Sequence, residues 1–151
     1  MDNKDVVDTL NDLIEVSKDG QKGFQASAEQ AKDTELKALF TQRAAECGQA
    51  ASELQSQVSQ YGGSPETGGS MAGAMHRGWV ALKGSMSSMT DHAVLEECER
   101  GEDHALARYR AAMKEELPPT LRTLVERQMQ GVQRNHDQIK ALRDRLAKVN
   151  P

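Results

Sequence analysis

The chain has 151 residues, of which 37% are hydrophobic, 28% are charged and only 3% are aromatic, a composition that suits one helical domain over residues 1–151 and disfavours a strand-rich fold. The formal net charge of −4 gives no electrostatic reason to expect nucleic acid or an anionic membrane as a partner, and no stretch approaches the roughly 18 apolar residues of a membrane span. The N-terminal sequence "MDNKDVVDTL" has acidic residues where a signal peptide would be basic, so we expect a cytoplasmic protein.

Hydrophobic residues recur at helical spacing from the N-terminus to about residue 61. The pattern predicts one helix over residues 5–31 and a second over residues 34–61. The segment between them, "AKDTE", is so short that the two helices must form an antiparallel hairpin. After the second helix, the glycine- and proline-containing stretch "YGGSPETGG" at 61–69 breaks the pattern.

A shorter helix is predicted over residues 70–87, within a connection that runs from residue 62 to residue 90. A helix of this length covers roughly 26 Å, so the connection can travel along the whole bundle and make the helices on either side of it parallel. One stripe of this crossover helix carries Met71, Met75, Trp79 and Met86. This stripe either anchors the crossover helix to the flank of the bundle or forms an adaptable patch for interaction with a partner.

Two more long helices complete the predicted fold. The third is expected over residues 91–116, with Thr90 or Asp91 as its capping residue. The sequence "LPPT" ends it, and Pro119 suits the first turn of a fourth helix that extends to about residue 148. The prediction is therefore an all-α, ferritin-like four-helix bundle with a short crossover helix between its second and third helices.

Several polar residues fall on the predicted inward stripes of the helices, near the middle of each helix. We therefore predict a polar layer halfway along the bundle, formed by Ser17, Gln21, Arg43, Glu102, Gln128 and Asn135. In the acidic stretch "ECERGEDHALARY" at 97–109, Glu102 is directed inward, whereas Asp103 points largely outward. A buried carboxylate must be paired, hydrogen-bonded, protonated or bound to a metal, and Arg43, Gln21, Asn135 and His136 are its expected partners.

The spacing typical of a di-iron bundle is incomplete in this sequence. Such a site takes one Glu from each of two helices and a Glu-x-x-His from each of the other two. The fourth helix has "QRNH" at 133–136, and the second helix has "ECGQ" at 46–49, so each lacks one ligand. A weaker, single metal site remains an alternative, with the candidate ligands Glu46, Glu99, Glu102 and His136. We favour the interpretation that the polar layer is a hydrogen-bonded structural element.

The chain resembles a bacterial family of ferritin-like four-helix-bundle proteins of unknown function. The resemblance covers nearly the whole chain and rests on "LNDLIEVSKDGQKGF" in the first helix, "GGSPETGGSMAGAMHRGWVALK" through the crossover, "EECERGEDHALARY" in the third helix and "NHDQIKALRD" in the fourth. Its most specific parts are "HRGW" at 76–79 and "RGED" at 100–103. The resemblance implies the bundle fold and the ferritin-like affiliation, and it implies no reaction.

Three functions are compatible with these observations. We expect a non-enzymatic structural or interaction protein that needs no cofactor and forms a homo-oligomer, most simply a dimer, because no complete catalytic motif occurs in the sequence. The alternative is a carboxylate protein that binds or oxidises iron or binds another divalent metal. A third possibility is that the protein binds a small apolar ligand in a gap left by its glycines and alanines.

Overall fold

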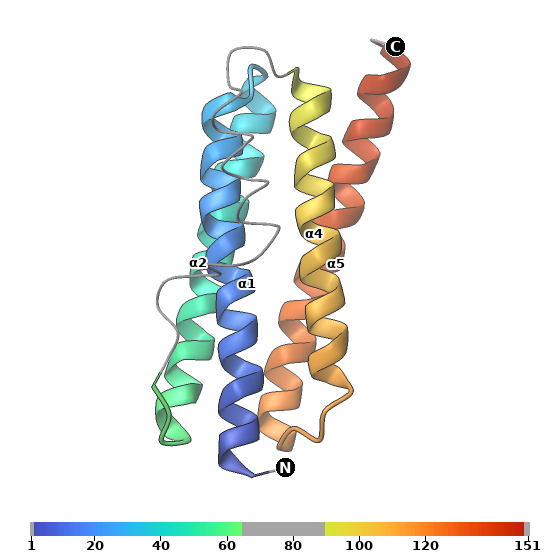
Figure 1. Ribbon diagram of the computed structural model, residues 1–151. Coiled ribbons are helices and arrows are strands. Elements are labelled where there is room, and N and C mark those ends of the chain that lie inside the picture. Colours follow the sequence, from blue (N-terminus) through green and yellow to red (C-terminus); the bar gives the residue numbers. More distant parts are fainter. Residues whose placement is uncertain (1, 65–89, 150–151) are drawn as a thin grey trace.

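Four long helices make up the part of the chain that the computed structural model describes, residues 2–64 and 90–149 (Figure 1). They are α1 (Asn3–Gln30), α2 (Thr34–Gln60), α4 (Asp91–Met113) and α5 (Pro119–Val149). No strand occurs in these residues, which confirms the all-α prediction for them, and the helix ends agree with the predicted ones within a helical turn. None of the four helices carries an apolar run sufficient to span a lipid bilayer. The predicted crossover helix, with Met71, Met75, Trp79 and Met86, lies outside the described residues.

The start of α4 is hydrogen-bonded to the turn between α1 and α2. Thr90 is its N-cap, because the Thr90 hydroxyl accepts the backbone N–H of Ala93 at 3.1 Å. Asp91, the other capping candidate, reaches the preceding hairpin, where its carboxylate accepts the backbone N–H groups of Lys32 and Asp33 at 2.8 and 3.1 Å. The starts of α2 and α4 therefore lie at the same end of the bundle, so these two helices run parallel, as the length of the connection between them predicted (Figure 1).

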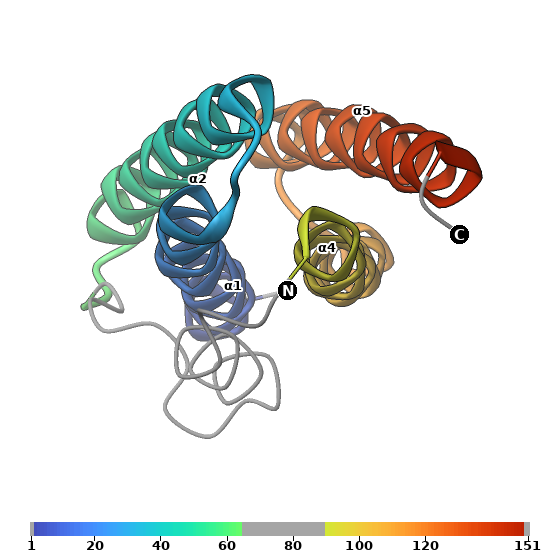
Figure 2. The same cartoon turned by 90° about the horizontal axis from the view of Figure 1, so that it is seen from above.

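The helices do not contact one another equally. α1 packs against both α2 and α4, and α4 packs against α5. α2 and α5 meet only over a short stretch, and Figure 2 shows both helices on the same side of the α1–α4 pair, extending away from each other. The side of the bundle between α2 and α5 is consequently its least closed side.

The hydrophobic core is divided into two clusters. One cluster is formed by the N-terminal halves of α1 and α5 and the C-terminal halves of α2 and α4. Its buried members include Val6, Leu10, Leu54, Val58, Leu121 and Val125. The other includes Phe24, Phe40, Leu95, Cys98 and Ile139, and the rings of Phe24 and Phe40 stack with their centroids 6.1 Å apart. Between the two clusters, buried polar side chains occur on α1, α4 and α5 (Ser17, Asp19, Glu99, Glu102 and Asn135), and Arg43 of α2 reaches Glu102 from within the second cluster. The fold thus positions a polar layer between two apolar halves.

Candidate functional site

A buried carboxylate occupies the centre of the polar layer. Glu102 on α4 is only 2% exposed, and its Oε1 accepts two hydrogen bonds, one from Arg43 Nε at 3.0 Å and one from Asn135 Nδ2 at 2.8 Å. The Arg43 guanidinium also lies over the Phe24 ring, 5.8 Å from its centroid, in a cation–π contact. The ion pair between Arg43 and Glu102 is therefore shielded from solvent and joins α2 to α4, while Asn135 adds α5.

The second oxygen of the same carboxylate is left without a partner. Glu102 Oε2 is buried, and no hydrogen-bond donor reaches it among the described residues. Both available donors, Arg43 and Asn135, are directed to Oε1 instead. Buried polar atoms in proteins almost always have a partner, so an unpaired carboxylate oxygen at this depth is an unusual feature.

A second hydrogen-bonded group lies further along the layer. The Tyr109 hydroxyl donates to Gln128 Oε1 at 2.9 Å, and Gln128 Nε2 donates to the Ala50 carbonyl at 3.3 Å and to Glu53 Oε1 at 3.1 Å. Burial raises the pKa of Tyr109 to about 12. Tyr109 thus remains a neutral donor at physiological pH, and this group connects α4, α5 and α2.

A cavity of about 320 Å³ adjoins both hydrogen-bonded groups and is lined by all four helices. Its wall includes small residues from every helix, which leave the space that larger side chains would fill; these are Ser17, Gly20, Ala50, Gly101, Ala105 and Gly131. Its apolar wall includes Val16, Phe24 and Val132. Glu102 and Glu46 also contribute to the lining. A cavity of the kind considered as a third possibility is therefore present, and its lining includes residues expected in the polar layer or as metal ligands, namely Ser17, Arg43, Glu46, Glu102 and Gln128.

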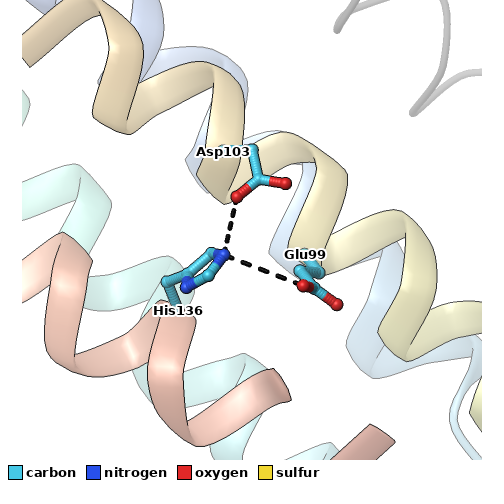
Figure 3. A group of neighbouring side chains, drawn as sticks. All are labelled: Glu99, Asp103 and His136. Atoms are coloured by element: carbon cyan, nitrogen blue, oxygen red, sulfur yellow. Dashed lines mark ion pairs between the residues drawn. The ribbon is translucent and has the colours of Figure 1, made fainter.

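An acidic cluster with one histidine lies at the contact between α4 and α5 (Figure 3). His136 Nε2 is 2.6 Å from Asp103 Oδ1 and 3.8 Å from Glu99 Oε1. The three side chains place one potential ligand atom each within 4.8 Å of one another. Glu99 and His136 are mostly buried, whereas the Asp103 side chain is 62% exposed, so the cluster is open to solvent on one side.

Two further side chains, Asp137 and Arg143, contact members of this cluster. His136 Nδ1 lies 3.3 Å from Asp137 Oδ1, a contact that orients the imidazole ring. Arg143, which also lies on α5, contacts the other oxygen of Glu99. It also pairs with Asp144 at 2.9 Å. The Arg143 guanidinium therefore competes with any cation for Glu99.

Both cysteines are free and buried, and neither has the surroundings of a reactive thiol. Burial raises the pKa of Cys47 to about 12, and burial also raises the pKa of Cys98. The Cys98 thiol donates to Ser27 Oγ at 3.3 Å. Both groups consequently remain protonated near neutral pH and act as small core side chains.

The chain matches the family model described as "Domain of unknown function (DUF2383)" over residues 5–115. The chain belongs to this family. The match includes α1, α2 and α4, and so includes Arg43 and Glu102, whereas Asn135 and His136 on α5 lie beyond it. No curated protein matches the chain. Because the description of the DUF2383 family names no activity, the function has to be argued from the geometry of the site.

In this DUF2383 domain the residues expected in the polar layer have the following positions. Five of them are buried: Ser17, Arg43, Glu102, Gln128 and Asn135. The sixth, Gln21, is half-buried and packs over Gly48, where a Cβ atom would approach Gln21 Nε2 to 2.7 Å. Three further polar side chains on α1 are buried although the sequence pattern did not indicate it, namely Asp19, Ser27 and Gln30. α1 packs against two helices and therefore buries a wider face than a single apolar stripe indicates.

The four expected metal ligands are separated into two places. Glu99 and His136 lie together, and the structure adds Asp103 to them. Glu46 and Glu102 line the cavity instead. Asp103 is exposed, as its place on the helical wheel indicated. It also lies one helical turn after Glu99, so its carboxylate reaches His136 at the edge of α5. Only the i, i+4 spacing of the two carboxylates could have indicated this pair from the sequence.

Proposed function

We propose that this protein is a ferritin-like bundle that acts in the cytoplasm as a non-enzymatic structural or interaction protein and associates as a homodimer. The observation that carries the proposal is the pairing of Glu102 with the Arg43 guanidinium at 3.0 Å and with the Asn135 amide at 2.8 Å. The parallel direction of α2 and α4 between two antiparallel hairpins supports the ferritin-like affiliation. The methionine and tryptophan stripe in the sequence supports self-association.

The residues at the centre of the bundle do not fit a pair of iron ions. A di-iron centre needs several carboxylates to balance the charge of two cations. Here the central carboxylate, Glu102, is already neutralised by a guanidinium, and its other hydrogen-bond partner, Asn135, is uncharged. Of the other carboxylates that line the cavity, Glu46 is exposed and Glu53 is paired with Arg127. A cation placed beside Glu102 would lie close to the positive charge of Arg43, which is held in place by its contact with Phe24. The layer is therefore suited to fixing the register of the helices.

The proposal is tested with the full chain, purified without a metal-affinity tag from cells grown in iron-rich medium. We expect elemental analysis to find no stoichiometric iron and an iron-oxidation assay to give the rate of the buffer alone. We expect light scattering to give twice the mass of one chain. Two bound iron atoms per chain would refute the non-enzymatic assignment, and a strict monomer at all concentrations would refute self-association.

A second candidate function is the binding of one divalent cation by Glu99, Asp103 and His136. The convergence of these three side chains within 4.8 Å favours it. One imidazole and two carboxylates suit Zn²⁺, Mn²⁺ or Fe²⁺, and the open side of the cluster leaves room for water ligands. The contact of His136 Nδ1 with Asp137 keeps the other ring nitrogen, Nε2, directed at the two carboxylates.

Calorimetric titration with Zn²⁺ tests the cation site. We expect His136→Ala to weaken Zn²⁺ binding by at least about 10–100-fold, because that loss already follows when only a group behind a metal ligand is removed. We expect Arg143→Gln to strengthen binding, because Glu99 then loses the competing guanidinium. His92→Ala is the matched control, since His92 pairs with Glu96 on the same helix at 2.9 Å and no third potential ligand joins them among the described residues. Equal affinities of the His136 and His92 variants would exclude the site.

A further inference from the structure

We infer that the cavity between the four helices binds a small, uncharged carbonyl compound with an apolar body, and that the carbonyl oxygen accepts a hydrogen bond from the Arg43 guanidinium. The volume of about 320 Å³ exceeds the roughly 150 Å³ of an apolar cavity that holds benzene, so a ring with a short carbonyl-bearing group fits. This site goes beyond the structural role proposed above, because the ligand would leave the ion pair between Arg43 and Glu102 in place.

The first argument is the set of unused donors on Arg43. A guanidinium carries five N–H groups, and this side chain is only 9% exposed. The N–H on Nε donates to Glu102, and the structure gives the guanidinium no other acceptor among the described residues. Its terminal nitrogens, Nη1 and Nη2, are nevertheless not among the fully buried side-chain atoms that lack a partner, so both keep surface that a solvent-sized group can touch. A ligand with an acceptor atom would satisfy them.

The second argument is the position of the guanidinium inside the bundle. Arg43 comes from α2, donates to Glu102 on α4, and covers the ring of Phe24 on α1 at 5.8 Å from its centroid. All three residues line the cavity. The guanidinium therefore lies between three helices, where the open space beside it is the cavity, and its accessible nitrogens face that space.

The third argument concerns the charges around the cavity. Three cations and three carboxylates contribute to the lining; these are Arg43, Arg127, Arg134, Glu46, Glu53 and Glu102. Four of them form ion pairs at 3.0 and 2.8 Å, and the other two, Glu46 and Arg134, are exposed and opposite in charge. The lining therefore has no net charge. An ammonium group would be repelled by the donors of Arg43, and a carboxylate would lie close to Glu102, whereas a neutral carbonyl oxygen avoids both costs.

The fourth argument concerns the wall and the entrance. Val16, Phe24 and Val132 provide apolar surface for the body of the molecule. Every lining residue of α1 and α4 is buried. The exposed members of the lining all belong to α2 and α5, namely Glu46, Gln49, Arg127 and Arg134. The cavity therefore opens between α2 and α5, the least closed side of the bundle, and α1 and α4 form its floor.

The first test compares three probes with the full chain by following amide chemical shifts during NMR titration. We expect acetophenone to bind about tenfold or more tightly than isopropenylbenzene, which has the same shape but a CH₂ group in place of the carbonyl oxygen. We expect benzoate, which carries a negative charge, to bind no better than the hydrocarbon. Equal binding of the ketone and the hydrocarbon, tighter binding of benzoate, or no binding of acetophenone up to its solubility would each overturn the inference.

The second test removes the donor without leaving an unpaired charge. The triple variant Arg43→Met, Glu102→Leu, Asn135→Leu loses the guanidinium together with its partners, so the chain is expected to fold. We expect this variant to bind acetophenone and isopropenylbenzene alike, whereas Arg110→Met, at an exposed arginine outside the cavity lining, should keep the preference for the ketone. A preference that persists in the triple variant would assign the donor to another group and refute the role of Arg43.

The third test fills the cavity and does not depend on Arg43. Gly131 lines the cavity on α5, and a Cβ atom there would meet only the Arg134 guanidinium, at an ordinary contact distance of 3.7 Å. Gly131→Phe should weaken acetophenone binding by about tenfold or more. Gln130→Phe, which places the same ring at the preceding, exposed position outside the lining, should not weaken it. Equal binding to the two variants would place the probe outside the cavity and contradict the proposal.

Discussion

Arg43→Met is expected to lower the free energy of unfolding by about 3–5 kcal/mol, the cost of removing one partner of a buried ion pair. The substitution keeps most of the side-chain volume but removes the guanidinium 3.0 Å from Glu102 Oε1. Glu102, which is 2% exposed, is then left with a single neutral donor, Asn135, and with an Oε2 that already has no described partner. Urea unfolding followed by circular dichroism at neutral pH measures the loss.

Two further variants separate the effect of an unpaired charge from the loss of a contact. The triple variant Arg43→Met, Glu102→Leu, Asn135→Leu removes the polar groups together, and we expect its stability to return to or exceed that of the unmodified chain. Arg127→Met is the matched control, because Arg127 pairs with Glu53 at 2.8 Å but is 61% exposed, and its loss should cost about 0.2–1 kcal/mol. If Arg43→Met costs no more than Arg127→Met, the central ion pair does not have the role assigned to it.

The four long helices and the central carboxylate could be predicted because both depend on local periodicity. Proline at position 119 marks the start of α5, and a repeat near 3.6 residues places Glu102 on the same stripe as Cys98 and Tyr109, which are all buried. The length of the connection between the second and third helices was enough to predict that α2 and α4 run parallel. Each of these predictions depends on the sequence within one helix or one connection and not on how the helices pack.

The cation cluster and the position of the cavity could not be predicted because both depend on how one helix is placed against another. Consecutive residues of α4, Glu102 and Asp103, face consecutive residues of α5, Asn135 and His136. A helical wheel gives the direction of each side chain about its own axis, but it does not give the sliding or rotation of α5 relative to α4. For that reason both Asn135 and His136 were expected as partners of Glu102, whereas in the structure only Asn135 donates to it and His136 faces Asp103.

A rise in pH from 9 to 11 is expected to lower the free energy of unfolding by up to about 5 kcal/mol through the two buried thiols alone. Burial raises the pKa of Cys47 to about 12 and also raises the pKa of Cys98, whereas a thiol in the unfolded chain ionises near pH 8.5. Above that pH the unfolded chain releases two protons that the native chain retains. The stabilisation is therefore complete below about pH 8.5 and is lost as the pH rises toward 12.

The double variant Cys47→Ala, Cys98→Ala isolates this contribution, because lysines and the two tyrosines titrate in both proteins and their effects cancel in the difference. Tyr109, whose pKa burial raises to about 12, is one of these shared groups. We expect the plot of unfolding free energy against pH to be shallower in the variant by about 2–3 kcal/mol per pH unit between pH 9 and 11, whatever the cost of the two truncations at neutral pH. Parallel plots would mean that the thiols ionise in the native chain as readily as in the unfolded one, and hence that the core around Phe40 and Ile139 admits water.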